Sequence, residues 1–424
     1  MFYLIILIWF VSSQQDSQKI TEISNYFSDL KIACKHNENV WGKNLYGPIL
    51  FVERSDRTVY ANRNTDSGLL KKNGSIFTGK LPDEINLANT AVEWNGRRWA
   101  MIMLPISTDK QKRINLMAHE LFHLWQPDFG FKSFNPDLKH LDQKNGRIYL
   151  RLETEALKQA ALKPDEAEKH LRNALTFRSY RNQLYPKTDS LENLLELNEG
   201  ICEFTGQELS GRTEQERLEN FIKRIDYFVS TPSYLRSFAY ETIPVYGYFL
   251  KQLNSDWYRK ITTETNLADL FRSAFHSNQK QLSERDIIGL ANAYNGNEIR
   301  AAENKREAEL IARINLHKTM LISGPHLTIP FEQMNMSFDY QLIFPLEDYG
   351  TVYPQIRISD NWGILEVEKS SLINPNWSSI TVSKPLKLSE KMASGDGWTL
   401  TLNTGYKIES LADGNFRLKK MAAN

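Results

Sequence analysis

The sequence has little of several features that would define a simple class of protein. Two cysteines in 424 residues exclude a small scaffold held together by disulfides. The 21 Gly and 15 Pro are too few for a fibrous or low-complexity chain. Lys and Arg number 52 against 51 Asp and Glu, without the surplus of positive charge that phosphate contacts require. We therefore expect a folded protein with no nucleic-acid partner.

Long hydrophobic runs are also missing. The run at the N-terminus, Phe2–Val11, has ten residues, about half of the roughly 20 that a helix needs to cross a bilayer. We expect no membrane span. Small residues at Val11 and Ser13 suit the positions that a signal peptidase reads, although no Lys or Arg precedes the run. The prediction is a signal peptide over residues 1–13, cleaved near Ser13, and an exported protein that is secreted or periplasmic; a buried N-terminal strand is the alternative.

Hydrophobic patterning divides the rest of the chain. From Asn39 to about residue 107, short apolar and aromatic runs are separated by turn residues, which is typical of strands. From there to about residue 320 the apolar period approaches 3.6, which predicts helices. Alternation then returns between tight turns, which predicts a β-sandwich-like domain over residues 321–424. The expected fold class is α+β, with residues 14–320 forming one domain before the C-terminal one.

One motif in the helical region combines groups that carry metal chemistry. Residues 119–123 read His-Glu-Leu-Phe-His, an H-E-x-x-H pattern. Residues four apart on an α-helix lie roughly 40° apart around its axis, so His119 and His123 can hold one metal ion. Apolar residues fall on the opposite side of this helix, which is expected to bury its back and turn both imidazoles into a cleft. Glu120, roughly 100° round the axis, suits a general base toward a metal-bound water. The alternative is a pair of exposed histidines on a solvated face.

This pattern resembles the zincin superfamily of zinc metallopeptidases. The metzincin branch continues with a Gly and a third His where this chain has Gln126 and Phe129, which excludes that branch. The other large branch, the gluzincins, takes its third zinc ligand from a Glu on a downstream helix. The resemblance implies a zincin-like catalytic domain, with a small N-terminal β sheet and a helical region, that binds Zn²⁺ and hydrolyses a peptide or protein substrate.

Two glutamates are candidates for the third ligand. Glu199 lies in Leu197-Asn198-Glu199-Gly200, which looks like the LNEG segment of aminopeptidase-type gluzincins, where the Glu before Gly binds zinc. Glu203, one turn on, is expected to accept a hydrogen bond from a ligand His, although an acidic stripe of this kind can also be a solvated face. Glu153 is the alternative ligand, because its carboxylate falls on an apolar stripe and needs a partner, which an Arg could also supply. The 75 residues between His123 and Glu199 exceed the interval in the aminopeptidases and require at least two inserted helices.

Other patterns are weaker. Tyr240 and Tyr246 follow at a distance where related peptidases place a residue that donates to the oxyanion; Tyr240 is the first choice and Tyr246 the second, and core aromatic residues are the alternative. The strand Trp99–Leu104 could be the edge along which an extended substrate pairs, or an inner strand. Trp362 and Trp398 stand next to tight turns, where they could stack on a ligand or close a β core.

The sequence leaves two classes of function open. The first is an exported zinc metallopeptidase, and the second is a non-catalytic secreted binding protein on a zincin scaffold that uses its cleft or its C-terminal β domain. The predicted site residues of the peptidase are His119, His123 and Glu199 as zinc ligands, Glu120 as the general base and Tyr240 as the oxyanion donor. A structural metal site would need a fourth protein ligand, for which Cys202 is the nearby cysteine. Cys34 and Cys202 could form a disulfide or remain thiols.

Overall fold

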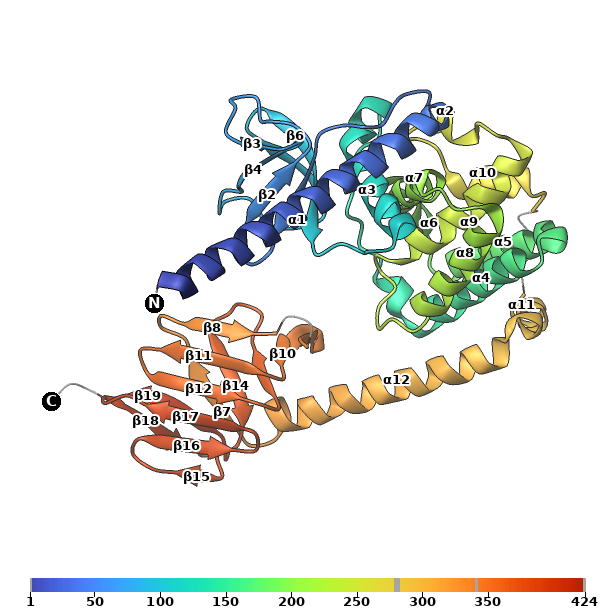
Figure 1. The fold of residues 1–424 in the computed structure, drawn as a ribbon. Helices are drawn as coiled ribbons and strands as arrows, with labels where there is room; N and C mark the ends of the chain where they lie inside the picture. The colour runs from blue at the N-terminus through green and yellow to red at the C-terminus, as the bar shows by residue number, and fades with distance from the viewer. Residues whose placement is uncertain (1, 278–282, 340–341, 422–424) are drawn as a thin grey trace. The chain divides into compact units, whose positions relative to one another are not determined.

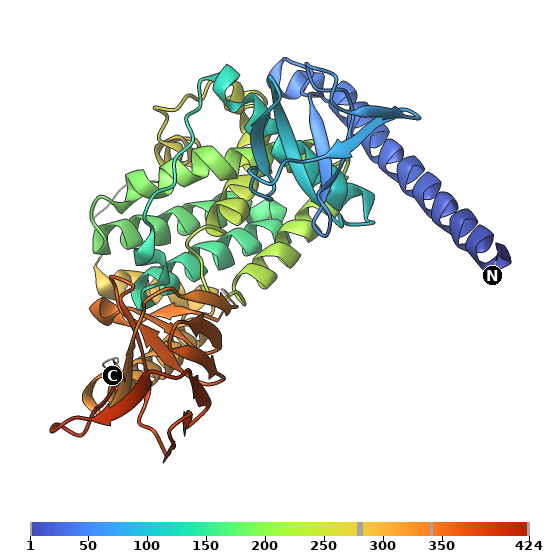
Figure 2. The ribbon, with the colours of Figure 1, turned by 90° about the vertical axis from the view of Figure 1, so that its left-hand side faces the viewer.

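The computed structural model describes residues 2–277, 283–339 and 342–421, and the chain divides into two compact units, one ending at Glu303 and one beginning at Asn304. The protein is α+β, with a helical region, separate β sheets and a β-rich C-terminal region (Figures 1 and 2). The division falls inside the long helix α12 (Gly296–Lys318), ahead of the predicted boundary at residue 320.

The first unit contains one six-stranded sheet, in the order β3-β4-β2-β1-β6-β5. Its strands are β1 (Ile49–Glu53), β2 (Thr58–Ala61), β3 (Lys71–Asn73), β4 (Ile76–Lys80), β5 (Thr90–Trp94) and β6 (Arg97–Leu104). Because successive side chains point to opposite faces, Phe51 and Ile102 enter the core shared with the helices, whereas Leu50 and Met101 enter a second core on the other face. The central strands are therefore covered on both sides.

The edge of this sheet next to β6 is β5, so Trp99–Leu104 is an inner strand, the second of the two interpretations of this segment, and not the edge. That segment belongs to β6, which pairs in parallel with β1 on one side and antiparallel with β5 on the other. Every residue from Trp99 to Leu104 is buried, as expected of a strand covered on both faces. The shorter, half-buried β5 takes the outer position.

The N-terminal segment forms one continuous helix, α1 (Phe2–His36), which includes all but the first residue of the predicted signal peptide. The domain prediction takes residues 14 to about 107 as β-rich, and it is wrong for residues 14–36, which continue this helix. Ile23, Phe27 and Leu30 recur at helical spacing and pack into the core of the first unit. No helix in the described part of the chain is long and apolar enough to cross a membrane.

The remaining helices of the first unit follow the sheet in sequence, apart from the short α2 that precedes it (Figure 1). They are α2 (Glu38–Trp41), α3 (Lys110–Trp125), α4 (Lys144–Leu162), α5 (Ala167–Leu184), α6 (Thr188–Leu195), α7 (Ile201–Leu209), α8 (Glu214–Phe228), α9 (Phe238–Leu253), α10 (Leu267–Ala274) and α11 (Glu284–Ala291). Asp109 caps the N-terminus of helix α3, and its carboxylate accepts a hydrogen bond of 3.0 Å from the backbone N–H of Lys112. A π-helical turn, η4 (Glu196–Gly200), joins α6 to α7.

The second unit contains two sheets, in the orders β18-β19-β7-β14-β13-β10-β9 and β15-β16-β17-β12-β11-β8. The strands are β7 (His326–Pro330), β8 (Asn335–Phe338), β9 (Phe344–Pro345), β10 (Thr351–Tyr353), β11 (Ile356–Asp360), β12 (Gly363–Val367), β13 (Ser371–Ile373), β14 (Ser379–Ser383), β15 (Lys387–Leu388), β16 (Met392–Gly395), β17 (Trp398–Leu402), β18 (Tyr406–Ser410) and β19 (Phe416–Lys420). Residues of both sheets share one core that includes Trp362 and Trp398. Their indole N–H groups donate to the Pro330 carbonyl and the Ser383 hydroxyl, each at 3.0 Å. These two rings are therefore core residues, not a stacking surface.

Candidate metal centre

Close approach of three helical segments brings the motif residues together. Helix α3 carries His119, Glu120 and His123, and it packs against α7. Gly206 of α7 permits this contact, because a Cβ there would lie 2.6 Å from the carbonyl oxygen of Asn115 on α3. Gly200 of η4 likewise meets the Ile243 side chain of α9, where a Cβ would lie 2.5 Å from Cγ1.

Hydrogen bonds to the outer ring nitrogens fix the orientation of both imidazoles. The Nδ1 of His119 lies 3.1 Å from Oε2 of Glu203, so it carries the proton and donates. The amide nitrogen of Gln126 donates to the backbone carbonyl of Asn198 at 2.7 Å, which turns the Gln126 oxygen toward His123. That oxygen accepts from Nδ1 of His123 at 2.8 Å. The Nδ1 proton positions follow from these partners, and they leave the Nε2 atom of each ring as the one that can bind a metal ion.

Three lone-pair donors then converge on one point. The two Nε2 atoms lie 3.1 Å apart, and Oε2 of Glu199 lies 3.4 Å from that of His119 and 3.3 Å from that of His123. In a tetrahedral zinc site with bonds of about 2.0–2.1 Å, neighbouring ligand atoms are separated by about 3.3 Å. Three acceptors at this spacing repel one another unless a proton or a metal ion lies between them. The donor set therefore fits a tetrahedral metal ion that keeps one position open.

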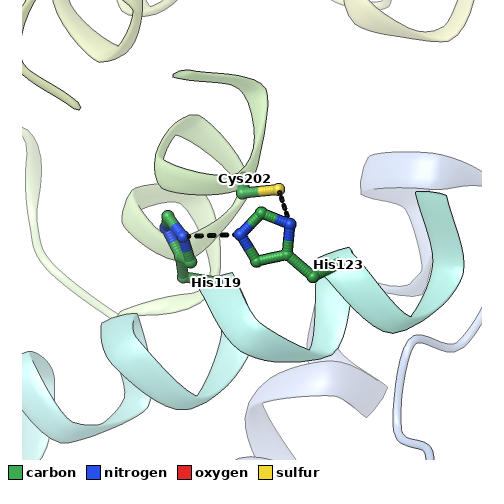
Figure 3. A group of neighbouring side chains, drawn as sticks. All are labelled: His119, His123 and Cys202. Carbon is green, nitrogen blue, oxygen red and sulfur yellow. Dashed lines mark hydrogen bonds between the residues drawn. The ribbon is translucent and has the colours of Figure 1, made fainter. Parts of the chain in front are cut away.

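Cys202 lies beside the same pair but on the outer side of His123, as Figure 3 shows. Its Sγ is 3.3 Å from Nδ1 of His123 and 2.9 Å from the Asn198 carbonyl, to which the thiol donates. The sulfur thus faces the ring nitrogen that points away from His119. Cys202 and Cys34 are both buried free thiols, so the two do not form a disulfide.

The electrostatics of this cluster favour a cation. Burial alone would lower the pKa of His119, but hydrogen bonds to Glu199 and Glu203 outweigh burial and raise it to about 10, so without a metal ion Nε2 also holds a proton, which a bound cation would displace. Burial alone would raise the pKa of Glu203, but Arg224 and the hydrogen bond from His119 lower it to about 2. The histidine pair is therefore surrounded by ionised carboxylates, and a proton or a metal ion is needed to balance them.

Glu120 is a buried carboxyl group with an unsatisfied atom. Its side chain is 5% exposed, and its Oε2 has no hydrogen-bond partner among the described residues. Burial raises the pKa of Glu120 above its ordinary value. Since such an atom is costly without a partner, its place on the wall of the cavity beside the His pair suggests that the partner is a solvent molecule or a ligand.

The two tyrosines lie in different surroundings. Tyr240 of α9 lines the same cavity, donates its hydroxyl to Oε2 of Glu199 at 2.5 Å and stacks on the His119 ring with centroids 5.2 Å apart. Tyr246 is fully buried, and its hydroxyl donates to Glu153 at 3.1 Å. Only Tyr240, of the two predicted candidates, is close to the histidine pair.

Glu153 takes part in a buried ion cluster. Its Oε2 accepts from Arg181 at 2.7 Å, and the neighbouring Arg178 donates to Glu196 at 2.8 Å. Arg181 also pairs with Glu192, and all five of these side chains are fully buried. The structure therefore places Glu153 in the Arg-paired arrangement that was the second interpretation of this residue. The acidic stripe that includes Glu192 and Glu196 is not a solvated face.

The histidine pair opens into a cavity of about 460 Å³ in the first unit. Five parts of the chain line it: the β5–β6 hairpin with the residue before it, helix α3, the segment after α3, the η4 turn, and α9 with the segment that leads into it. The lining residues are Asn89, Thr90, Ala91, Arg98, His119, Glu120, His123, Gln126, Ser133, Phe134, Asn135, Asn198, Glu199, Arg236 and Tyr240. A cavity of this size accommodates a small ligand or a few residues of a peptide.

Several of these residues were not singled out from the sequence. Gln126 served only to exclude a family branch, yet it orients His123. Arg98 and Arg236 gave no signal, because nothing in a strand or a loop identifies the Arg that faces a cavity. No protein-family model, curated protein or solved structure matches this chain.

Proposed function

We propose that this protein is a zinc-dependent peptidase with a gluzincin-like catalytic unit. One observation carries the proposal: ligand atoms of His119, His123 and Glu199 converge at tetrahedral spacing beside Glu120, whose Oε2 has no partner among the described residues. Such a constellation is costly to bury unless an ion and a solvent molecule complete it. Zinc metallopeptidases use this combination of two His, one Glu and a free carboxylate.

The ion would be held by His119, His123 and Glu199. When bound there, zinc supplies a Lewis acid and lowers the pKa of a coordinated water toward about 7. Glu203 holds the proton of His119 on Nδ1, and Gln126 does the same for His123. These two contacts keep both Nε2 atoms available as ligands.

The chain's own residues would then move the protons. Glu120 has a raised pKa and a free oxygen, so it can accept a proton from the attacking water and return it to the leaving amine. Burial and the nearby Glu199 hold the pKa of Tyr240 well above its ordinary value, so its hydroxyl stays protonated and can donate to the oxyanion. The hydroxyl now points at Glu199 and would turn to the substrate oxygen.

The sheet edge offers a way to orient a substrate. Thr90 and Ala91 of the edge strand β5 line the cavity. An extended peptide can add to such an edge by main-chain hydrogen bonds and lie across the metal centre. This strand, and not the adjacent β6, would then be the edge along which the substrate pairs.

Metal analysis of the purified full-length chain tests the proposal. We expect about one equivalent of zinc in the unsubstituted protein, little in Glu199→Ala, and an undiminished amount in the matched variant Cys202→Ala. Hydrolysis of a peptide library, abolished by a chelator and restored by zinc, is expected as well. Zinc retained in Glu199→Ala and lost in Cys202→Ala would contradict the ligand set. Tight zinc binding without any hydrolysis would favour a non-catalytic binding protein.

Export remains a prediction from the sequence. We propose that residues 1–13 are removed near Ser13. Mass spectrometry of the N-terminus of the protein from its natural host tests this, and an intact Met1 in the mature chain would contradict it.

A further inference from the structure

The charges on the cavity wall allow the substrate class to be inferred, and this step rests on the proposed function. Four charged groups besides the histidines line the cavity within the described parts of the chain: Glu120, Glu199, Arg98 and Arg236. Both carboxylates are committed to the proposed metal centre. The two guanidinium groups are not.

Arg236 lies on the segment that leads into α9 and is an exposed residue. Its guanidinium donates to the side-chain oxygen of Asn135, which also lines the cavity. Among the described residues, no carboxylate lies within ion-pair distance of Arg236. An Arg that is held in place by a neutral amide keeps most of its donors for a ligand.

Arg98 lies on β6 and reaches the cavity from the sheet. Its charged neighbour is Glu93, a 75% exposed side chain whose Oε1 is 3.9 Å from Nε. Its other contact is a hydrogen bond of 3.4 Å to the carbonyl oxygen of Leu124 at the end of α3. An exposed ion pair this long contributes little, so a bound anion can replace it.

We propose that this cavity binds peptides that carry a carboxylate close to the scissile bond, and that Arg98 and Arg236 recognise it. Arg binds carboxylates with paired, charge-assisted hydrogen bonds. The two carboxylates and two guanidinium groups balance, so a bound dication would give the wall a surplus of positive charge and favour an anionic ligand further. An ammonium group finds no such partner, because the two carboxylates are both used. The recognised carboxylate is either an Asp or Glu side chain or the C-terminal carboxylate of the substrate.

Binding of four labelled hexapeptides to the full-length chain tests this inference. They share one sequence and differ in charge: a neutral amidated peptide, one with an internal Asp, one with a free C-terminal carboxylate and one with an internal Lys. Glu120→Gln serves as the background so that bound peptide is not cut, and fluorescence anisotropy gives Kd. We expect one or both carboxylate peptides to bind about 10-fold more tightly than the neutral one, and the Lys peptide no more tightly. Which of the two gains affinity identifies the source of the carboxylate.

Variants of the two arginines separate recognition from general charge. Arg98→Ala and Arg236→Ala should each remove most of the advantage of the carboxylate peptides. The matched control is Arg97→Ala on the same strand, because Arg97 pairs with Asp66 outside the cavity lining, and the advantage should persist there. Equal affinity for all four peptides, or an advantage that survives in the Arg98→Ala/Arg236→Ala double variant, would overturn the inference.

Cleavage of the same peptides by the unsubstituted protein, which retains Glu120, distinguishes this inference from the proposed function. If all four peptides are cut with the same kcat/KM, the protein is a peptidase and the inference is overturned. If none is cut but binding still depends on Arg98 and Arg236, the carboxylate site stands and the proposed peptidase activity fails. Unchanged thermal unfolding of the variants confirms that each one is folded.

Discussion

Oε2 of Glu203 lies 3.1 Å from Nδ1 of His119, and this contact determines which nitrogen of His119 is available to a metal ion. Glu203 is itself held by Asn115 and Gln207, whose amides donate to its Oε1 at 3.0 and 2.9 Å, and by Arg224 at 3.0 Å. The imidazole is thus oriented by a carboxylate that cannot rotate away.

Replacing this carboxylate tests its role. We expect Glu203→Gln to lower zinc affinity by about 10- to 100-fold, because the amide is a weaker acceptor and no longer fixes the charge of the ring. Competition with a chromogenic chelator measures the affinity. The matched variant is Glu241→Gln, since Glu241 also pairs with Arg224 at 2.9 Å and is not bonded to either histidine. An equal loss in both variants would assign the effect to Arg224 and not to His119.

Glu120→Gln separates metal binding from turnover. The substitution keeps the size of the side chain and removes its ability to accept a proton, so zinc content should stay near that of the unsubstituted protein while kcat falls by about 10² or more. Elemental analysis and steady-state kinetics on the same preparation give the two quantities. Undiminished kcat would rule out Glu120 as the general base.

Tyr240→Phe tests the proposed oxyanion donor. We expect kcat to fall by about 10² with zinc retained, because a donor that acts in the transition state is lost. Tyr246→Phe is the matched control. Its hydroxyl bonds Glu153 in the buried cluster, so its loss should lower stability by about 1 kcal/mol and leave kcat unchanged. A larger kinetic defect in Tyr246→Phe than in Tyr240→Phe would reverse the assignment.

The stability that the N-terminal cap of helix α3 contributes should decrease in acid. The hydrogen bond from the backbone N–H of Lys112 lowers the pKa of Asp109 below its ordinary value of 3.8. A carboxyl group whose pKa falls on folding contributes stability above the pKa of the unfolded chain, and this contribution is lost as the pH falls through the folded-state pKa. Urea unfolding between pH 7 and pH 2 follows this loss.

Two substitutions isolate the effect of Asp109. Asp109→Ala should cost about 1 kcal/mol at pH 7, because an N-terminal cap is lost. Asp109→Asn retains a capping oxygen and should stay within a few tenths of a kcal/mol at pH 7, but without this acid-dependent contribution. Since every other carboxyl group is common to both proteins, the difference in their pH profiles belongs to Asp109. Parallel profiles would contradict the prediction.

The parts of the fold and the site that depend on local pattern could be predicted from the sequence. The helical period around His119 indicated a buried back and a His pair turned into a cleft, and both histidines line the cavity. The C-terminal alternation likewise indicated a β-rich region. Glu199 was selected by a short motif, and the structure brings it to the two histidines.

The parts that depend on distant partners could not be predicted in the same way. The sequence places Glu153 on an apolar stripe, where its carboxylate needs a partner. Only the fold shows that this partner is Arg181. The order of β5 and β6 at the sheet edge depends on where β1 pairs, about 50 residues earlier in the chain. Residues 14–36 were expected to be part of the β-rich region, because the strand-like runs that begin at Asn39 outweighed the helical spacing of Ile23, Phe27 and Leu30.

The distance along the chain between the two halves of the metal centre has a mechanical consequence. Helices α4, α5 and α6 lie between His123 and Glu199, so an ion bound by both would act as a cross-link that closes a long loop. Such a clip restricts the unfolded chain more than the folded one. Saturating zinc should therefore protect these three helices from proteolysis and amide exchange together, as one cooperative block.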